Sequence, residues 1–257
     1  MAGSPPMHRM VWCLALGQVV VWAAMYYSFP AMLLVWEGEL GWSKTELSGA
    51  FSLSLVLSGA LAPWSGRLID RDKGKWVLIG GTTLGALSLI GLSAVTKVWH
   101  FYFFWGLLGI SMAGCLYEPC FAVITRVLTS NSRRAITLVT LIAGFAGTVS
   151  FPSCHALVEW YGWRATVLIL GSVVIMVGLP LMWLGCAALG EEKSRNSPRP
   201  SARTQEVFTV MRKPVFWCIA GGFALVALNH GILITHLLPL LEEREIQPQL
   251  AVFAASM

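Results

Sequence analysis

The chain has 257 residues, of which 56% are hydrophobic and only 12% are charged, and its mean hydropathy is +0.68. A soluble globular domain has about 25% charged residues, so this composition excludes an ordinary soluble domain. The formal net charge is +5, which nucleic-acid binding or a membrane topology could explain, and the positions of the charges decide between the two.

Seven apolar stretches follow one another, at residues 10–36, 47–64, 76–96, 98–124, 135–158, 165–189 and 215–241, and an eighth begins near Gln247. A hydrocarbon core about 30 Å thick requires about 20 apolar residues per helix, and these stretches reach or approach that length. Their apolar runs are nearly continuous, which excludes a transmembrane barrel, and they lack the polar faces of a soluble bundle. We expect no cleaved signal peptide, because the first stretch is longer than the roughly 7–15 apolar residues of such a segment. The predicted fold class is all-α, a polytopic transmembrane helix bundle.

The connections between these stretches are mostly short, which forces neighbouring helices to run antiparallel. Ser43 and Glu46, three residues apart, form a capping box at the start of the second helix. The long polar segment 190–213 is the exception and contains Pro198 and Pro200. We therefore expect a six-helix unit at 1–189, a cytoplasmic linker at 190–213 and the incomplete start of a second transmembrane unit at 214–257.

The basic residues are unevenly divided between the two sides of the predicted membrane. If the N-terminus is cytoplasmic and each stretch crosses once, only Lys44, Lys97, Arg164 and Arg244 fall outside, and the other fourteen of the 18 fall inside. This asymmetry follows the positive-inside rule, so it indicates topology and not nucleic-acid binding. We expect an integral membrane protein with a cytoplasmic N-terminus, in the inner membrane of a bacterium.

Signatures of soluble enzymes and cofactor sites are absent from the sequence. All six cysteines lie within apolar stretches, and none forms a CxxC pair, so neither a disulfide framework nor a zinc site is expected. There is no phosphate-binding loop, no HExxH and no GxSxG. We therefore predict no enzymatic activity and no cofactor.

The loop between the second and third stretches reads GRLIDRDKGK at residues 66–75. It resembles the cytoplasmic signature of the major facilitator superfamily, G-x-L-x-D-R-x-G-R-K, with the second glycine one place later. The segments GWSKTEL at 41–47 and YGWR at 161–164 look like those of the oxalate/formate and monocarboxylate carriers. Trp105 stands where the drug–proton antiporter branch has an arginine, so multidrug export is less favoured. The resemblance covers nearly the whole chain and implies the N-terminal half, the central loop and the start of the second half of a twelve-helix carrier.

The same loop supplies the candidate gating residues. Gly66 would let two helices approach closely, and Gly74 would permit a turn conformation closed to other residues. Asp70 could pair with an arginine or with a helix N-terminus. The resemblance implies that this loop clasps the two halves in one conformation, with Arg71 and Arg126 taking part. The alternative is a solvated loop that only enforces topology.

Glu118 is the first candidate for proton coupling or solute binding, because it is the only acidic residue deep within an apolar stretch. A charge at that depth costs about 2.5–3.5 kcal/mol, so the carboxyl must be protonated, paired or facing water. It could couple proton movement to transport or bind a cationic solute. Alternatively, Arg126 could pair with it in a purely structural role.

Further candidates for the same site lie on the first and seventh helices. Gln18 and Tyr26 fall on one helical face with Trp22 between them, and packing is the alternative explanation. On the seventh helix, Asn229 and His236 share a face, and His230 is adjacent to Asn229. These groups could bind a carboxylate or carry protons, or could be satisfied by neighbouring helices.

The sequence predicts a secondary active transporter of a small organic solute, an anion such as a carboxylate, that works by alternating access with proton coupling or exchange. Its expected partners are the bilayer, the solute and protons, without nucleic acid. The alternative is a truncated or half-carrier membrane protein without autonomous transport, acting by assembly or regulation, which would need oligomerisation. Reading the DNA beyond codon 257 would discriminate between the two.

Overall fold

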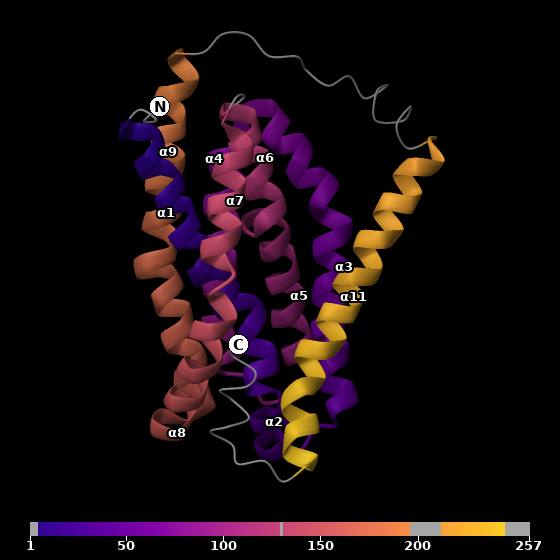
Figure 1. Cartoon of the computed structure of the whole chain (residues 1–257). Helices are drawn as coiled ribbons and strands as arrows, with labels where there is room; N and C mark the ends of the chain where they lie inside the picture. Colours follow the sequence, from indigo (N-terminus) through magenta and orange to yellow (C-terminus); the bar gives the residue numbers. More distant parts are fainter. Residues whose placement is uncertain (1–4, 129–130, 196–211, 245–257) are drawn as a thin grey trace.

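The computed structural model describes residues 5–128, 131–195 and 212–244, and within these ranges the regular structure is helical (Figure 1). The predicted all-α bundle is confirmed. Most of the predicted linker, residues 196–211, and the eighth apolar stretch lie outside the described residues. The first part of the linker is helical, since the preceding helix continues to Arg195.

The first crossing is one continuous helix, composed of α1 (Pro5–Trp22), the π-helical turn η1 (Ala23–Tyr27) and α2 (Ser28–Leu40). It ends at Gly41, whose φ of 69° is left-handed and so favours glycine. The capping box then begins α3 (Lys44–Leu68). The N–H of Glu46 donates to Ser43 Oγ at 3.3 Å, and the N–H of Ser43 donates to Glu46 Oε2 at 2.9 Å, as predicted.

Two long helical stretches turn back on themselves. The first runs from α3 through η2 (Ile69–Lys73) into α4 (Gly74–Leu92), and the chain reverses at Arg71 and Asp72. The second runs from α7 (Ser132–Ala143) through α8 (Ala146–Val173) and η3 (Val174–Gly178) into α9 (Leu179–Arg195). It reverses inside α8 at Gly162, where φ is 76°. Within the described residues, five helical stretches are long and apolar enough to cross a membrane, and two of them reverse, which matches the seven apolar stretches of the sequence.

The helix pair α5 (Val98–Cys115) and α6 (Tyr117–Val127) forms the fourth crossing and packs against both α3 and α4. The contacts are backbone to backbone. A Cβ atom on Gly109 would lie 2.3 Å from the carbonyl oxygen of Ser54 in α3. A Cβ atom on Gly81 of α4 would lie 2.8 Å from the carbonyl carbon of Gly114. Small residues at these points let the helices approach more closely than side chains would allow.

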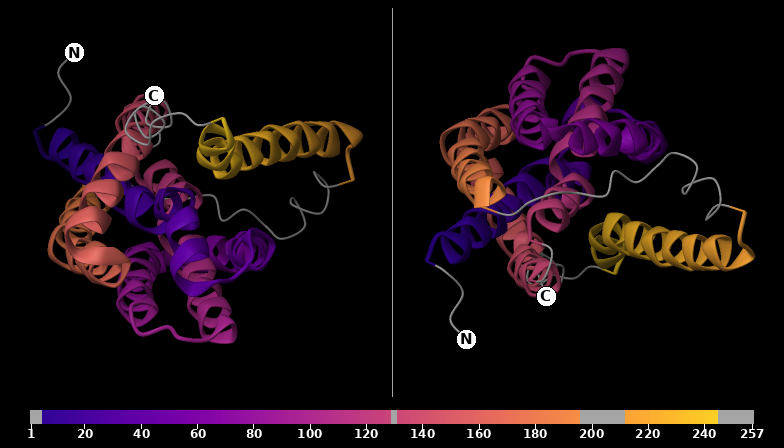
Figure 2. Two further views of the ribbon diagram at one scale, coloured as in Figure 1. Left: turned by 90° about the horizontal axis from the view of Figure 1, so that it is seen from below. Right: turned by 90° about the horizontal axis from the view of Figure 1, so that it is seen from above.

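The last described helix, α11 (Pro214–Glu243), touches the other helices mainly through its C-terminal part. Ile234 and Leu241 pack against Phe151 of α8, and Thr235 is buried. Near the other end of α11, Phe223 is 75% exposed. Figures 1 and 2 show the Pro214 end of α11 standing apart from the remaining helices.

Candidate functional site

Glu118 lies on the first turn of α6, immediately after a break in the fourth crossing. The break is at Leu116, which has extended backbone angles (φ −78°, ψ −156°) between two helical segments. The Glu118 side chain is exposed and has no hydrogen bond or ion pair with any residue that the structure describes. Of the three states considered for this carboxyl, the structure therefore does not show the paired one.

Gln18 of α1 is fully buried behind this break. Its Nε2 atom donates to the carbonyl oxygen of Cys115 at 2.8 Å and lies 3.4 Å from that of Leu116. Gln18 therefore contacts the broken helix and presents no exposed surface.

An aromatic cluster adjoins Glu118 and joins α1, η1 and α6. The Trp22 ring lies 4.6 Å from Tyr117 and 5.1 Å from Tyr26, measured between ring centroids. Tyr117 in turn stacks on Phe121 at 5.0 Å. Tyr26 is largely buried, at 8% exposure, and its hydroxyl oxygen would lie 4.0 Å from a Cβ atom on Gly231 of α11. The structure thus brings Tyr26 into one aromatic cluster with Tyr117, the neighbour of Glu118.

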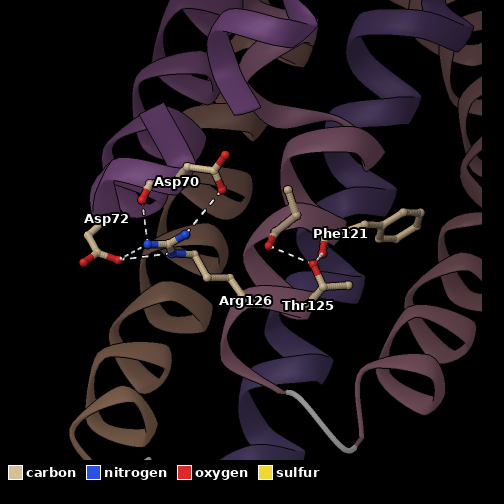
Figure 3. Close-up of polar contacts among 6 residues, drawn as sticks. Asp70, Asp72, Phe121, Thr125 and Arg126 are labelled. Atoms are coloured by element: carbon tan, nitrogen blue, oxygen red, sulfur yellow. Dashed lines mark hydrogen bonds and ion pairs between the residues drawn. The ribbon is translucent and has the colours of Figure 1, made fainter. Parts of the chain in front are cut away.

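Arg126, at the end of α6, binds the η2 turn and not Glu118 (Figure 3). Its Nε and Nη2 atoms donate to Asp72 Oδ1 at 3.1 and 2.8 Å. Its Nη1 and Nη2 atoms donate to Asp70, to the carboxylate at 3.3 Å and to the backbone carbonyl at 2.6 Å. The alternative ion pair between Arg126 and Glu118 is wrong for this structure, because the guanidinium is engaged by these two aspartates. Asp70 pairs with an arginine, as expected, and the exposed Arg71 makes none of these bonds.

Two of the roles expected for loop glycines are corrected. Gly74 has ordinary right-handed angles (φ −54°, ψ −40°), and the left-handed residue of the turn is Asp72, with φ 64°. Gly74 is needed for a different reason: a Cβ atom there would lie 2.7 Å from Val123 Cγ2. A Cβ atom on Gly66 would have no described atom within 4 Å, so the expected close helix approach is not made there.

The candidates on α11 are not gathered around Glu118 by any described contact. Asn229 and His230 both lie on the helix with exposed side chains. His236 also lies on α11, and its side chain is outside what the structure describes.

Two residues of this region were not identified from the sequence. Tyr117 links Glu118 to the aromatic cluster, and nothing in its spacing distinguished it from other aromatic residues. For Asp72 a signal was available: the loop has one additional residue between Asp70 and the second glycine, and an inserted residue must be accommodated by a change in the turn.

These features define an integral membrane protein of the polytopic helical class, with a carboxyl at a broken crossing and a charged turn at one end of the bundle. The sequence profile described as Major Facilitator Superfamily matches residues 14–257, and the chain belongs to this family of membrane transporters. This confirms the family that the loop at 66–75 indicated.

Several known proteins are similar to the chain. Monocarboxylate transporter 1 of Bos taurus is 25% identical over 210 residues, which cover 79% of this chain and 39% of that protein. The MFS transporter asaE of Aspergillus flavus is 25% identical over 75% of this chain and 42% of its own length. A multi-drug resistance efflux pump PmrA homolog of Lactococcus lactis subsp. lactis is 28% identical over 51% of this chain and 32% of its own length. The chain thus spans less than half the length of these relatives.

Among solved structures, the crystal structure of tetrameric PepTSo2 aligns with a TM-score of 0.54 and 15% sequence identity. The alignment covers 88% of this chain and 49% of that chain. At this identity the likeness shows the fold alone.

Proposed function

We propose that this chain forms part of a secondary active transporter for a small organic anion such as a monocarboxylate. In this proposal the two halves of the carrier alternate in access around a solute near the middle of the membrane, and transport is coupled to protons or to exchange. Glu118 carries the coupling proton.

The observation that carries the proposal is the state of the Glu118 carboxyl. It follows a helix break within the apolar stretch of residues 98–127, and it is exposed without a described partner. An ionisable group inside a membrane span is costly to retain, so it is expected to face the bundle interior or a water-filled path and to serve transport. The aromatic cluster around Tyr26 and Tyr117 offers apolar surface next to this polar group, the combination that small-solute sites use.

The proposed solute class rests on two kinds of support. Monocarboxylate transporter 1 is among the similar proteins, and a protonatable carboxyl explains how an anion could be accompanied by a proton. Asn229 and His230, exposed on α11, are suited to bind a carboxylate if α11 faces the same path. His236 is proposed for the same face from its spacing alone. Gln18, which has no exposed surface, is not proposed to touch the solute.

The proposed orientation places the N-terminus and η2 in the cytoplasm of a bacterial cell. Arg67, Arg71, Lys73 and Lys75 concentrate positive charge around η2, and the positive-inside rule assigns such loops to the cytoplasm. In this orientation the clamp of Arg126 on Asp70 and Asp72 lies at the cytoplasmic end, where it is proposed to stabilise one conformation of the carrier.

The test is uptake of radiolabelled pyruvate and lactate into proteoliposomes that contain the protein at its full encoded length. We expect an inwardly directed proton gradient to accelerate uptake. Glu118→Gln should abolish this acceleration and retain exchange of labelled for unlabelled solute, because a permanently neutral side chain mimics one protonation state. Glu39→Gln is the matched control, since Glu39 is an exposed carboxylate at the end of α2, and it should behave as the wild type.

Two results would count against the proposal. If no tested carboxylate were taken up or exchanged, the proposal that the solute is a small organic anion would be rejected. Unaltered proton coupling in Glu118→Gln would remove Glu118 from the mechanism while leaving transport itself in place.

A further inference from the structure

At the break between α5 and α6, the buried carbonyl of Cys115 lacks its helical hydrogen bond. In an α-helix the carbonyl of residue i accepts from the N–H of residue i+4. For Cys115 that residue is Pro119, which has no N–H. The next carbonyl, that of Leu116, does have its helical donor, the N–H of Cys120 at 3.2 Å. The carbonyl of Cys115, a fully buried residue, therefore has no donor from its own helix.

Gln18 supplies the donor that Pro119 lacks. Its Nε2 atom lies 2.8 Å from the Cys115 carbonyl oxygen, a good hydrogen-bond distance. The bond joins α1 to a point 97 residues further along the chain. The Oε1 atom of the same amide is buried and has no hydrogen bond with a described residue, although the Gln18 side chain also lies close enough to the Cys120 thiol to interact with it. The amide nitrogen must face the Cys115 carbonyl, because the amide oxygen cannot donate to it, so this bond determines the orientation of the Gln18 amide.

We propose that Gln18 is a positioning residue for Glu118. Its bond to Cys115 holds the break at Leu116 in one geometry, and that break sets the direction of the first turn of α6. Glu118 lies on this turn, three residues after Cys115. The consequence for proton coupling rests on the function proposed above, whereas the dependence of the break on Gln18 does not.

The dependence of the break on Gln18 is tested by a double-mutant cycle on unfolding in detergent micelles. Gln18→Leu should raise the unfolding equilibrium constant about 3- to 16-fold, the range for one interhelical hydrogen bond in a membrane protein. In a Pro119→Ala background, Gln18→Leu should raise the unfolding equilibrium constant by a smaller factor. The reason is that the new N–H of residue 119 can donate to the carbonyl of Cys115. If Gln18→Leu alone fails to fold, recovery of folding in the double variant is the expected result.

Ser150→Ala is the matched control for this cycle. Ser150 Oγ also donates from a buried side chain to a backbone carbonyl of the first crossing, that of Ala23, at 2.8 Å. Ser150→Ala should change the unfolding equilibrium constant by the same factor whether residue 119 is proline or alanine. Equal costs of Gln18→Leu in both backgrounds, or a double variant that does not fold, would overturn the proposal.

The position of residue 118 is tested separately by thiol labelling. In a background with Cys13 and Cys218 replaced by serine, the rate of Glu118→Cys with a water-soluble maleimide should change about threefold or more when Gln18→Leu is added. It should not change when Ser150→Ala is added. An unchanged rate in the Gln18 variant would refute the positioning role.

Transport then distinguishes the positioning role of Gln18 from the function proposed for Glu118. Gln18→Leu should shift the pH profile of pyruvate uptake, and Ser150→Ala should not. If no carboxylate is transported but the cycle and the labelling behave as described, the function proposed for Glu118 fails and the positioning by Gln18 stands. If pyruvate is transported with an unshifted pH profile in Gln18→Leu, the positioning role fails and the transporter remains.

Discussion

Substitutions of Asp72 in the η2 turn can distinguish the contribution of its charge from the contribution of its backbone conformation. Asp72 has a left-handed backbone, and its carboxylate accepts two hydrogen bonds from Arg126. Asp72→Asn keeps an acceptor oxygen and a residue that tolerates φ above zero, but it removes the charge. Asp72→Gly keeps the conformation and removes the acceptor, and Asp72→Ala loses both.

The expected sizes follow from exposure and backbone strain. The Asp72 side chain is 47% exposed, so solvent screens the ion pair, and pairs of this kind contribute about 0.2–1 kcal/mol. Placing an ordinary L-residue in the left-handed region costs roughly 1–2 kcal/mol, and Asn escapes most of this cost. Asp72→Asn should therefore lower the free energy of unfolding by about 0.5 kcal/mol, and Asp72→Ala by about 2 kcal/mol. Asp72→Gly should fall between them, because glycine avoids the strain but gives a more flexible unfolded chain.

The assay is equilibrium unfolding in detergent micelles at low salt and at about 1 M salt, where the Debye length is about 3 Å. Salt should reduce the cost of Asp72→Asn and leave the difference between alanine and glycine unchanged. Lys73→Ala, at the next exposed position, should have little effect. An alanine variant as stable as the asparagine variant would refute the argument from the left-handed conformation.

Two further predictions concern helix packing and helix initiation. Gly109→Ala should lower the free energy of unfolding by about 1–3 kcal/mol, because the new Cβ would lie 2.3 Å from the backbone oxygen of Ser54. Gly59→Ala is the control, since its Cβ would have no described atom within 4 Å, and it should leave the protein equally or more stable in thermal unfolding. Equal melting temperatures for these two variants would contradict the close approach of α3 and α5. Ser43→Ala should cost about 1 kcal/mol by removing the cap of α3, and Ser43→Asn should restore most of it, as measured by the same unfolding assay. If Glu46→Gln proved as costly as Ser43→Ala, the capping box would not be the cause, since glutamine can also close it.

The crossings were predictable from the sequence because lipid imposes a simple rule on the backbone. Each span must satisfy its own hydrogen bonds, so a span is visible as an apolar run of sufficient length. The capping box of Ser43 and Glu46 was predictable for a similar reason, since both partners lie within four residues. The π-helical turns η1 and η3 lie in uninterrupted apolar sequence and left no comparable signal.

The roles of Gln18 and Gly74 depended on partners distant in sequence. Pro119 indicates that the carbonyl of Cys115 needs another donor, but the sequence does not say which side chain provides it. Gly74 was expected to supply a left-handed angle, yet Val123 of α6 is what excludes a side chain there. The side chain of Glu118 could be identified as unusual from its depth alone, whereas its lack of a described partner required the structure.

The glycine contacts of α5 also bear on which parts of the molecule can move. Side chains between two helices can change rotamer and so act as a compliant layer, but where backbone meets backbone, as at Gly109 with Ser54 and at Gly81 with Gly114, there is no such layer. Sliding of α5 against α3 or α4 would therefore require the helices to separate first, and the three should move as one rigid body. The described contact of α11 with its neighbours is different, because side chains such as Ile234 and Leu241, in its C-terminal part, make it. The helix has 30 residues and is roughly 45 Å long. A small rotation of α11 about its C-terminal contact would therefore displace Pro214, at the opposite end, by a much larger distance.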